Sequence, residues 1–336
     1  MKIAVIGCGA IGGTLLAYLS RAGADVRGVM KSSQLADVSG KGLRLEGARG
    51  AEQVKVRGVE RLGEPVDLAV CATKIPDLEE ALERAAPFLR DAVTVTTQNG
   101  VAADAIAQRF VPRERILSGV VMFGATYLPP AKIVHHFEGP LLLGNPWEKK
   151  VPRAEEIKRE LSRAVEISFC PDILGAKYLK LFVNLNNCVP AVLGCSLQEA
   201  FSSPEIAEIA VRLNREAYRV VAARGIVLQS LPTYPKERLE KLVSLPVKEA
   251  AGIFSRIMQS LSETPVYGSV LQSIRRGRRS EIDYLNGEIV RLAAQGSQPA
   301  FYNRTIVDMV HSVEQSGRFF SREELVKKME QEKEAA

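Results

Sequence analysis

The chain has 336 residues with 46% hydrophobic and 25% charged side chains, a composition typical of a globular protein with two domains and ample core. Its formal net charge of +6 fits either nucleic acid or an anionic small ligand, and the basic run RRGRR at 275–279 lacks the interleaved aromatic residues of nucleic-acid binders. For this reason the sequence does not predict a nucleic-acid partner. No window approaches 18 uninterrupted apolar residues, so the sequence does not predict a membrane span either.

The first half of the chain alternates strand-like and helix-like segments. Residues 2–6 form a short apolar run that predicts a strand rather than a signal peptide, and GCGAIG and an apolar-periodic stretch to residue 19 follow it. Further strands are predicted at residues 24–30, 67–73, 92–97, 115–127 and 140–144, with the helix-like LEEALERAAPFL after the second of these. Continuous apolar runs that alternate with helices are typical of a parallel sheet buried on both faces, so we expect an α/β domain.

From about residue 171 onward the apolar periodicity is helical, and strand signals are few. Long helical patterns cover residues 204–223 and 281–295, and the charged tail after residue 321 predicts a surface helix that frays. The change of pattern near residues 168–172 predicts two domains, residues 1–170 and residues 171–336.

A glycine motif opens the first predicted helix. Gly7, Gly9 and Gly12 of GCGAIG follow a strand and start a helix. This context suits a dinucleotide, because glycines permit a tight turn and let the backbone approach the pyrophosphate at a helix amino terminus. A purely structural turn is the alternative, and the βαβ context favours the nucleotide cofactor.

The end of the second predicted strand indicates which dinucleotide binds. NAD sites usually place an acidic residue there for the ribose hydroxyls. This chain has Lys31 followed by Ser32 and Ser33, a cation and two hydroxyls that suit the 2′-phosphate of NADP. A solvated lysine after a strand is the alternative.

Two more polar residues stand where predicted strands end. Lys74 directly follows DLAVCAT, and Asn99-Gly100 follows AVTVTTQ. In an open α/β sheet, ligands bind outside the carboxyl ends of the strands. Asn-Gly is also a strong turn former, but two polar residues at adjacent strand ends favour a site.

The stretch KYLKLFVNLNNC at 177–188 combines an apolar helix pattern with lysines and asparagines. At about 100° per residue, Lys180 and Asn184 lie roughly 40° apart and Asn187 lies roughly 20° to the other side of Lys180. Lys177 joins the same edge, whereas Asn186 points nearly opposite. This polar stripe is either a solvated helix face or the wall of a substrate site.

A second polar constellation occurs in GSVLQSIRRGRRSEIDYLNGEIV at 268–290. Ser269 lies in the run before Glu281, which opens the next helical pattern beside Ser280. Ser280 could cap that helix, with Asp283 in its first turn. Glu281 could serve a site or merely favour the helix dipole.

The five cysteines, Cys8, Cys71, Cys170, Cys188 and Cys195, form no CxxC pair and lie in or beside apolar sequence. This pattern predicts reduced, mostly buried thiols in a cytosolic protein and no disulfide or zinc scaffold. The three histidines are too scattered for a metal cluster, so we expect no metal site.

Together, MKIAVIGCGAIGG, the lysine after DLAVCAT, QNG at 98–100, KYLKLFVN and SEIDYLNG with its upstream SVLQSIRRGRR resemble the ketopantoate reductase (2-dehydropantoate 2-reductase) family. The resemblance covers essentially the full length, and the SEIDYLNG segment is its most specific part. It implies an amino-terminal Rossmann domain that binds NADP and an all-helical carboxyl-terminal domain of the 6-phosphogluconate dehydrogenase type for substrate and catalysis.

The resemblance also implies roles for individual residues. Lys180 matches the catalytic lysine, a general acid toward the ketone oxygen. Glu281 matches a glutamate that helps position substrate and lysine. Asn99 matches the asparagine between nicotinamide and substrate. Asn184 and Ser269 match substrate-binding positions.

On the cofactor side, Lys74 matches a family lysine and Lys31 stands where the family has a basic residue for the 2′-phosphate. The residues expected to bind the cofactor are therefore Gly7, Cys8, Gly9, Ala10, Ile11, Gly12, Lys31, Lys74 and Asn99. An ammonium donor such as Lys180 supplies a proton and a charge, and a nearby carboxylate such as Glu281 would keep it charged despite burial.

Two positions depart from the family pattern. Tyr178 replaces a common tryptophan, which is a mild change. Cys188 replaces a second substrate-binding asparagine, and a thiol cannot reproduce the hydrogen bonds of an amide. Our hypothesis is that Asn187 supplies the second amide and that Cys188 packs as a small apolar residue.

The expected function is NADPH-dependent reduction of 2-dehydropantoate to (R)-pantoate in the cytoplasm, for pantothenate and coenzyme A biosynthesis. Because of Cys188, a D-2-hydroxyacid dehydrogenase acting on another branched or aromatic 2-keto acid is an alternative. A non-catalytic nucleotide-binding redox sensor is a third hypothesis, which retention of Lys180 and Glu281 disfavours. The expected partner is a small 2-keto acid, and a homodimer is left open.

Overall fold

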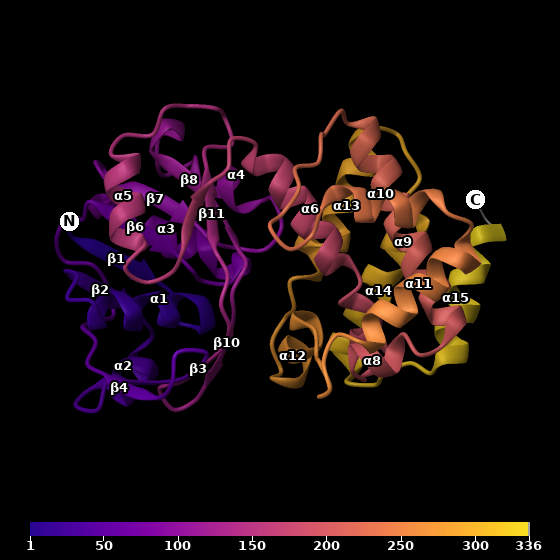
Figure 1. The fold of residues 1–336 in the computed structure, drawn as a ribbon, viewed down its shortest axis with the longest axis horizontal. Helices are drawn as coiled ribbons and strands as arrows, with labels where there is room; N and C mark the ends of the chain where they lie inside the picture. The colour runs from indigo at the N-terminus through magenta and orange to yellow at the C-terminus, as the bar shows by residue number, and fades with distance from the viewer. Residues whose placement is uncertain (335–336) are drawn as a thin grey trace. The chain divides into compact units, whose positions relative to one another are not determined.

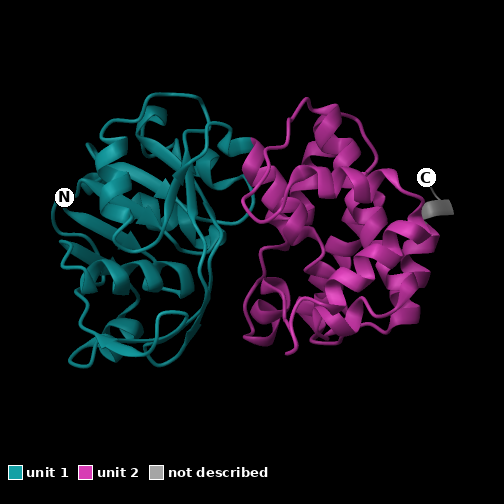
Figure 2. Ribbon diagram, in the orientation of Figure 1, with its two compact units in different colours: residues 1–174 teal, residues 175–336 magenta. Residues whose placement is uncertain are grey.

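A computed structural model describes residues 1–334 as two compact units (Figure 2). Unit 1 runs from Met1 to Leu174, and unit 2 begins at Gly175. The division falls inside helix α6 (Ile173–Leu185), which carries the polar stripe.

Unit 1 is built on an eight-stranded sheet with the order β12-β11-β8-β7-β6-β1-β2-β5. From β5 to β8 the paired strands are all parallel, and β11 then runs antiparallel to β8. The bounds are β1 (Ile3–Ile6), β2 (Val26–Val29), β5 (Gly58–Val59), β6 (Leu68–Cys71), β7 (Val93–Thr96), β8 (Ile116–Val121), β11 (Leu141–Gly144) and β12 (Ile167–Phe169) (Figure 1).

This strand order confirms the predicted Rossmann-type fold. The chain moves outward from β1 through β2 to β5 and then returns to the other side of β1 with β6, β7 and β8. The order therefore reverses between β1 and β6, and in doubly wound sheets ligands bind at the carboxyl ends of the strands at such a point. Strands β1, β6 and β7 are fully buried, as expected for strands covered on both faces.

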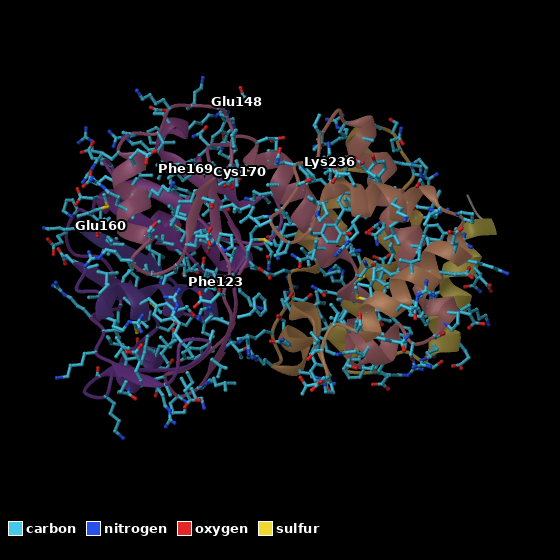
Figure 3. All side chains as sticks on the ribbon, in the orientation of Figure 1. Phe123, Glu148, Glu160, Phe169, Cys170 and Lys236 are labelled. Atoms are coloured by element: carbon cyan, nitrogen blue, oxygen red, sulfur yellow. The ribbon has the colours of Figure 1, made fainter. Side chains whose placement is uncertain are left out.

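A second sheet of unit 1 was not predicted. Its order is β4-β3-β10-β9, with β3 (Leu43–Gly47), β4 (Glu52–Val54), β9 (Gly124–Leu128) and β10 (Lys132–Phe137). The single strand predicted at 115–127 is wrong, because β8 and β9 divide it between the two sheets. The chain leaves the large sheet at Phe123, which Figure 3 labels. Phe123 is buried against His135. Two strands in direct succession give no sequence signal of such a break.

Helix α1 (Ala10–Arg21) lies between the two sheets of unit 1. It packs against β1 and β2 of the large sheet and against β3, β9 and β10 of the small one, which accounts for the burial of Gly12 through Leu19. The other helices are α2 (Ser32–Val38), α3 (Leu78–Ala85), α4 (Ala103–Ala107) and α5 (Ala154–Leu161), with short 3-10 turns η1 (Ile75–Asp77), η2 (Ala86–Phe88) and η3 (Arg113–Arg115).

Unit 2 is helical, and residues 175–334 contain no named strand. The helices after α6 are α7 (Cys188–Leu193), α8 (Leu197–Ala200), α9 (Pro204–Ala223), α10 (Lys236–Ser244), α11 (Val247–Gln259), α12 (Ser269–Arg275), α13 (Asn286–Gln295), α14 (Phe301–Ser316) and α15 (Arg322–Glu334). Helix α9 packs against α11, α13 and α14 (Figure 1). The all-helical prediction for this half is confirmed.

The predicted helix at 204–223 matches α9, but the helix predicted at 281–295 begins later. A 3-10 turn, η4 (Ile282–Tyr284), comes first, and α13 starts only at Asn286. Leu285 has backbone angles of φ −110° and ψ −95°, which interrupt the helix. Apolar periodicity continues through this interruption and therefore could not reveal it.

A buried polar network holds α9, α13 and α14 together. The Glu216 carboxylate accepts hydrogen bonds from the backbone N–H groups of Tyr302 and Asn303 at the start of α14, at 3.0 and 2.8 Å. Asn303 in turn accepts from Asn286, the first residue of α13, at 3.0 Å. Since unpaired helix-end N–H groups are costly when buried, Glu216 satisfies the start of α14 from within the core.

The predicted burial of most cysteine thiols is confirmed in the described chain. All five cysteines are free, and Cys195 alone among them is not fully buried. The helix predicted in the charged segment after residue 321 is also confirmed. It is α15, which follows Ser321 and buries Leu325 and Met329. Within residues 1–334, we find no helix with the length and apolar character that crossing a membrane requires.

Candidate active site

Three glycines form the turn between β1 and α1, each for a different reason. Gly7 has φ +93°, and a Cβ there would lie 2.6 Å from the backbone nitrogen of Thr73, just beyond β6. A Cβ on Gly12 would lie 2.0 Å from the carbonyl oxygen of Gly7. Gly7 therefore permits the turn, and Gly12 lets α1 pack directly behind it.

Gly9 differs, because a Cβ at this position would meet no atom within 4 Å. The space above this glycine is open, and Gly9 precedes the first turn of α1, where unpaired backbone N–H groups favour an anion. Ala10 and Ile11, which begin α1, are partly exposed. This geometry fits a dinucleotide pyrophosphate held by backbone N–H groups.

Cys8 takes part in the glycine loop only through its backbone. Its thiol is buried and points to the carbonyl oxygens of Val5 and Val29, both 3.7 Å away, and burial raises its pKa to about 12. Its own carbonyl oxygen accepts a hydrogen bond of 2.8 Å from Gln34 of α2. Gln34 thereby ties the start of α2 to the glycine loop.

Lys31 stands immediately before α2, two residues after β2 ends. Lys31, Ser32 and Ser33 are all exposed. The exposed cation and hydroxyls therefore lie less than one helical turn from Gln34, which bonds to the glycine loop.

The loops after β6 and β7 are joined by a buried amide. The side chain of Gln98 donates to the carbonyl oxygens of Cys71 and Thr73, at 2.9 and 3.0 Å. Gln98 thus places the loop that carries Lys74 beside the loop that carries Asn99. Both of these residues are partly exposed, in accordance with the prediction that they lie at adjacent strand ends.

In unit 2, the stripe on α6 is less uniform than the helical wheel predicted. Lys180 and Asn184 are partly exposed, but Lys177 is only 2% exposed and so does not share their surface. Asn186 lies just beyond the end of α6, is buried and accepts a hydrogen bond of 3.1 Å from the buried Asn214. The candidate stripe is therefore shorter than expected at its amino-terminal end.

Burial lowers the pKa of Lys180 from its ordinary value. A low-dielectric environment disfavours the charged ammonium, and here that effect decides the direction of the shift. The expectation that Glu281 keeps the Lys180 ammonium charged stays a prediction, since desolvation is the cause of this shift.

Helix α6 ends at Leu185, and the chain bends before α7 begins at Cys188. The Asn187 backbone N–H bonds to the Asn184 carbonyl oxygen at 3.0 Å, a turn rather than a continued helix. The Cys188 thiol is fully buried and bonds to the Leu185 carbonyl oxygen at 2.8 Å, and burial raises its pKa to about 12. Cys188 accordingly packs in the interior, whereas Asn187 stays partly exposed.

The structure brings Asn187 to the start of α12. A Cβ on Gly268 would lie 2.9 Å from Asn187 Oδ1 and 3.0 Å from its Cβ and Cγ atoms. Gly268 directly precedes Ser269, which begins α12 and is partly exposed. Two of the substrate-binding residues expected from the sequence are thus neighbours through Gly268.

Glu281 is 8% exposed and precedes η4. Its neighbours fix the local backbone. The Ser280 N–H donates to Glu314 at 2.7 Å, and the Ser280 hydroxyl accepts from the Ile282 N–H at 3.3 Å. Asp283 pairs with His311 at 3.0 Å. The expectation that Ser280 caps the long helix is therefore wrong: α13 has Leu285 as its N-cap, and Ser280 bonds instead to the first N–H of η4, whose N-cap is Glu281.

Two matches decide the classification of the chain. The family model described as ketopantoate reductase PanE/ApbA matches residues 3–147, and the model for the carboxyl-terminal part of the same family matches residues 172–314. The chain belongs to the ketopantoate reductase family. It is therefore an oxidoreductase of a family that uses a nicotinamide dinucleotide.

Curated relatives cover nearly the whole chain. A 2-dehydropantoate 2-reductase of Pyrococcus horikoshii is 26% identical over 320 residues, covering 94% of this chain and 99% of the relative. One of Mesorhizobium japonicum is 29% identical, covering 89% of this chain and 93% of the relative.

Solved structures share the fold. D-Mandelate dehydrogenase in a ternary structure with NADH and anilino(oxo)acetate superposes with a TM-score of 0.81 at 24% identity, covering 94% of this chain and 99% of the other. The PanE/ApbA family ketopantoate reductase from Ralstonia eutropha superposes with a TM-score of 0.80 at the same identity and coverage.

Sequence reasoning missed three residues that shape this ketopantoate reductase family member. Gln98 joins two loops, Gly268 accommodates Asn187, and Glu288 of α13 is hydrogen-bonded to Tyr178 of α6. Burial and this bond to a carboxylate raise the pKa of Tyr178. Gln98 lies in a segment quoted for the resemblance and Gly268 directly precedes another, but the sequence carries no signal of the contacts that they make.

Proposed function

We propose that the protein reduces 2-dehydropantoate to (R)-pantoate with NADPH, a step of pantothenate and coenzyme A biosynthesis. The observation that carries the proposal is Lys180, a largely buried lysine with a lowered pKa, one helical turn from Asn184. Membership of the ketopantoate reductase family supports the same assignment.

In this proposal, unit 1 is the NADP-binding domain. When bound, the dinucleotide supplies the hydride that reduces the keto carbon. The backbone around Gly9 holds the pyrophosphate, and exposed Lys31 pairs with the 2′-phosphate. Lys74 and Asn99, at the adjacent ends of β6 and β7, bind the cofactor close to the reacting end.

Unit 2 is proposed to supply the proton. As the keto carbon is reduced, negative charge develops on its oxygen, and Lys180 Nζ donates the proton that converts this oxygen to the hydroxyl. The lowered pKa makes Lys180 a stronger acid than an ordinary lysine. Because the residue is partly exposed, its neutral amine can regain a proton from water.

The amides of Asn184 and Asn187 and the hydroxyl of Ser269 are proposed to bind the polar groups of the substrate. These groups donate hydrogen bonds to a carboxylate or hydroxyl without adding net charge. Glu281 is proposed to orient substrate and lysine, a role that suits a buried carboxylate on a backbone fixed by Ser280 and Glu314.

Oxidation of NADPH in the presence of ketopantoate, followed by absorbance, tests the proposal directly. Turnover with formation of (R)-pantoate is the expected result. A protein that binds NADPH but turns over neither ketopantoate nor any other 2-keto acid would contradict it and would favour a non-catalytic role.

Cofactor preference gives a separate prediction. A charge-assisted contact between Lys31 and the 2′-phosphate is worth about 1.5–3 kcal/mol, so we expect a preference for NADPH over NADH of roughly ten- to a hundredfold. Lys31→Asp should abolish most of this preference and leave turnover at saturating cofactor nearly unchanged. Lys41→Asp, at another exposed lysine of unit 1, is the matched control. Equal kcat/KM with both cofactors in the parent would refute the role of Lys31.

One observation favours a second candidate, a D-2-hydroxyacid dehydrogenase for a different branched or aromatic keto acid. Cys188 is buried and bonded to its own helix turn, so no polar group is presented at this position. A substrate without the 4-hydroxyl of ketopantoate would need no polar group of the protein at this position. The shared fold with D-mandelate dehydrogenase is compatible with this candidate.

Two variants choose between these candidates. If Asn187 supplies the second amide, Asn187→Ala should raise KM for ketopantoate by about two- to tenfold, as expected for loss of one hydrogen bond. Cys188→Ala should leave KM unchanged, because the thiol is turned into the interior. A silent Asn187→Ala, together with faster reduction of a keto acid lacking the 4-hydroxyl, would support the second candidate.

The proposal also includes the cytoplasm as the location, which the five free thiols support. The proposal does not assign an oligomeric state, and a homodimer is one assembly that the family resemblance leaves open. Light scattering of the purified protein tests the oligomeric state.

A further inference from the structure

The contact between Asn187 and Gly268 depends on the absence of a side chain at residue 268. Three atoms of Asn187, namely Oδ1, Cβ and Cγ, lie within 2.9–3.0 Å of the point that a Cβ of residue 268 would occupy. Real Cβ atoms essentially never come closer than 3.0 Å to a neighbour, so the Asn187 side chain would have to shift by a few tenths of an ångström if residue 268 had a side chain.

The backbone of Gly268 does not itself require glycine. Its angles are φ −65° and ψ 157°, an extended conformation that any residue adopts. Gly268 is also buried and is the N-cap residue of α12, where glycine is preferred to alanine. The close approach of the Asn187 side chain is a second reason for glycine at this position.

The amide end of Asn187 takes part in this contact. Among the three closest atoms, Oδ1 comes nearest to the point that a Cβ of residue 268 would occupy. Ser269, one residue further along, is partly exposed and adds a hydroxyl next to this amide.

We propose that Gly268 is a positioning residue that determines substrate specificity, because its missing Cβ lets the Asn187 amide lie beside Ser269 and bind a polar group of the 2-keto acid. The inference rests on the proposed function, in which Asn187 and Ser269 bind substrate. It explains how a chain with an inward-facing thiol at residue 188 still presents a second amide.

Steady-state kinetics of Gly268→Ala, Asn187→Ala and the double variant test this inference on the 2-keto acid that the parent reduces best. We expect Gly268→Ala to raise KM by roughly two- to tenfold, the effect of losing one hydrogen bond, with kcat and the dissociation constant of NADPH unchanged. The double variant should have the KM of Asn187→Ala, because two changes that act through one contact are not additive.

Gly252→Ala is the matched control. Gly252 lies within α11, and a Cβ there would meet only Arg256 Nη1, at 3.7 Å, so this variant should keep the parental KM. If Gly268→Ala does not fold, the double variant carries the test, because Asn187→Ala removes Oδ1 and Cγ, two of the three close atoms. Its folding with the KM of Asn187→Ala supports the inference.

The outcomes separate this inference from the proposed function. An active parent whose Gly268→Ala variant keeps the parental KM overturns the inference alone, as does a double variant with additive effects. A parent that reduces no 2-keto acid overturns the proposed function and the inference together.

Discussion

Lys180→Ala is expected to reduce turnover of the keto acid by about 10²–10⁴, the range for removal of a general acid. The variant should still bind NADPH, because the glycine loop and Lys31 belong to the other unit. Rapid-mixing measurement of a single turnover checks the chemical step directly.

The pH dependence should identify the same group. A general acid must be protonated, so the parental rate should fall as the pH rises through the pKa of Lys180, and burial places that pKa below the ordinary lysine value of about 10.4. In Lys180→Ala this alkaline fall should disappear. Lys241→Ala, an exposed lysine of α10, should behave like the parent. A near-parental rate in Lys180→Ala would mean that another group donates the proton.

Gly9→Ala is expected to weaken binding of NADPH by roughly ten- to a hundredfold, because a methyl group placed where a ligand packs costs about 1–3 kcal/mol. The protein itself has room for this methyl group, since no atom lies within 4 Å of the added Cβ. The thermal unfolding midpoint should therefore stay near the parental value, while fluorescence titration shows the loss of affinity.

Two other glycines provide the controls for Gly9→Ala. Gly63→Ala adds a methyl group in equally open space outside the loop and should leave both properties unchanged. Gly12→Ala should lower the unfolding midpoint as well as the affinity, since its Cβ would overlap the Gly7 carbonyl oxygen. Parental affinity for NADPH in Gly9→Ala would show that the cofactor does not lie over this loop.

Some features of the molecule could be derived from adjacent residues alone. The buried strands β1, β6 and β7 were recognisable as apolar runs, because their burial on both faces removes any need for polar residues. The glycine spacing after β1 likewise reflects a local turn. Lys180 and Asn184 were correctly placed on one side of a helix, since the helical repeat depends only on separation along the chain.

The small sheet of unit 1 lay beyond this reasoning. Its strands pair β3 with β4 and with the distant β10, and partners far apart in the chain follow from packing around α1 rather than from any one segment. Propensity for strands depends on such neighbours, so short half-exposed strands carry a weak signal of their own.

Whether the polar groups of α6 are exposed or buried was also decided only by tertiary structure. Sequence spacing grouped Lys177 with Lys180, yet packing buries the first and leaves the second partly exposed. The direction of the Lys180 pKa shift follows from how much solvent its surroundings exclude, which no local pattern contains.

The amino-acid sequence by itself indicated the alternation of strands and helices in the large sheet, the glycine loop and the helical second half, because each depends on neighbours along the chain. Only the tertiary structure decided that Cys188 turns inward and that Asn187 lies against Gly268. A bend of the chain after Leu185 and close contact with α12 set these orientations, and contacts between distant segments depend on how whole helices pack.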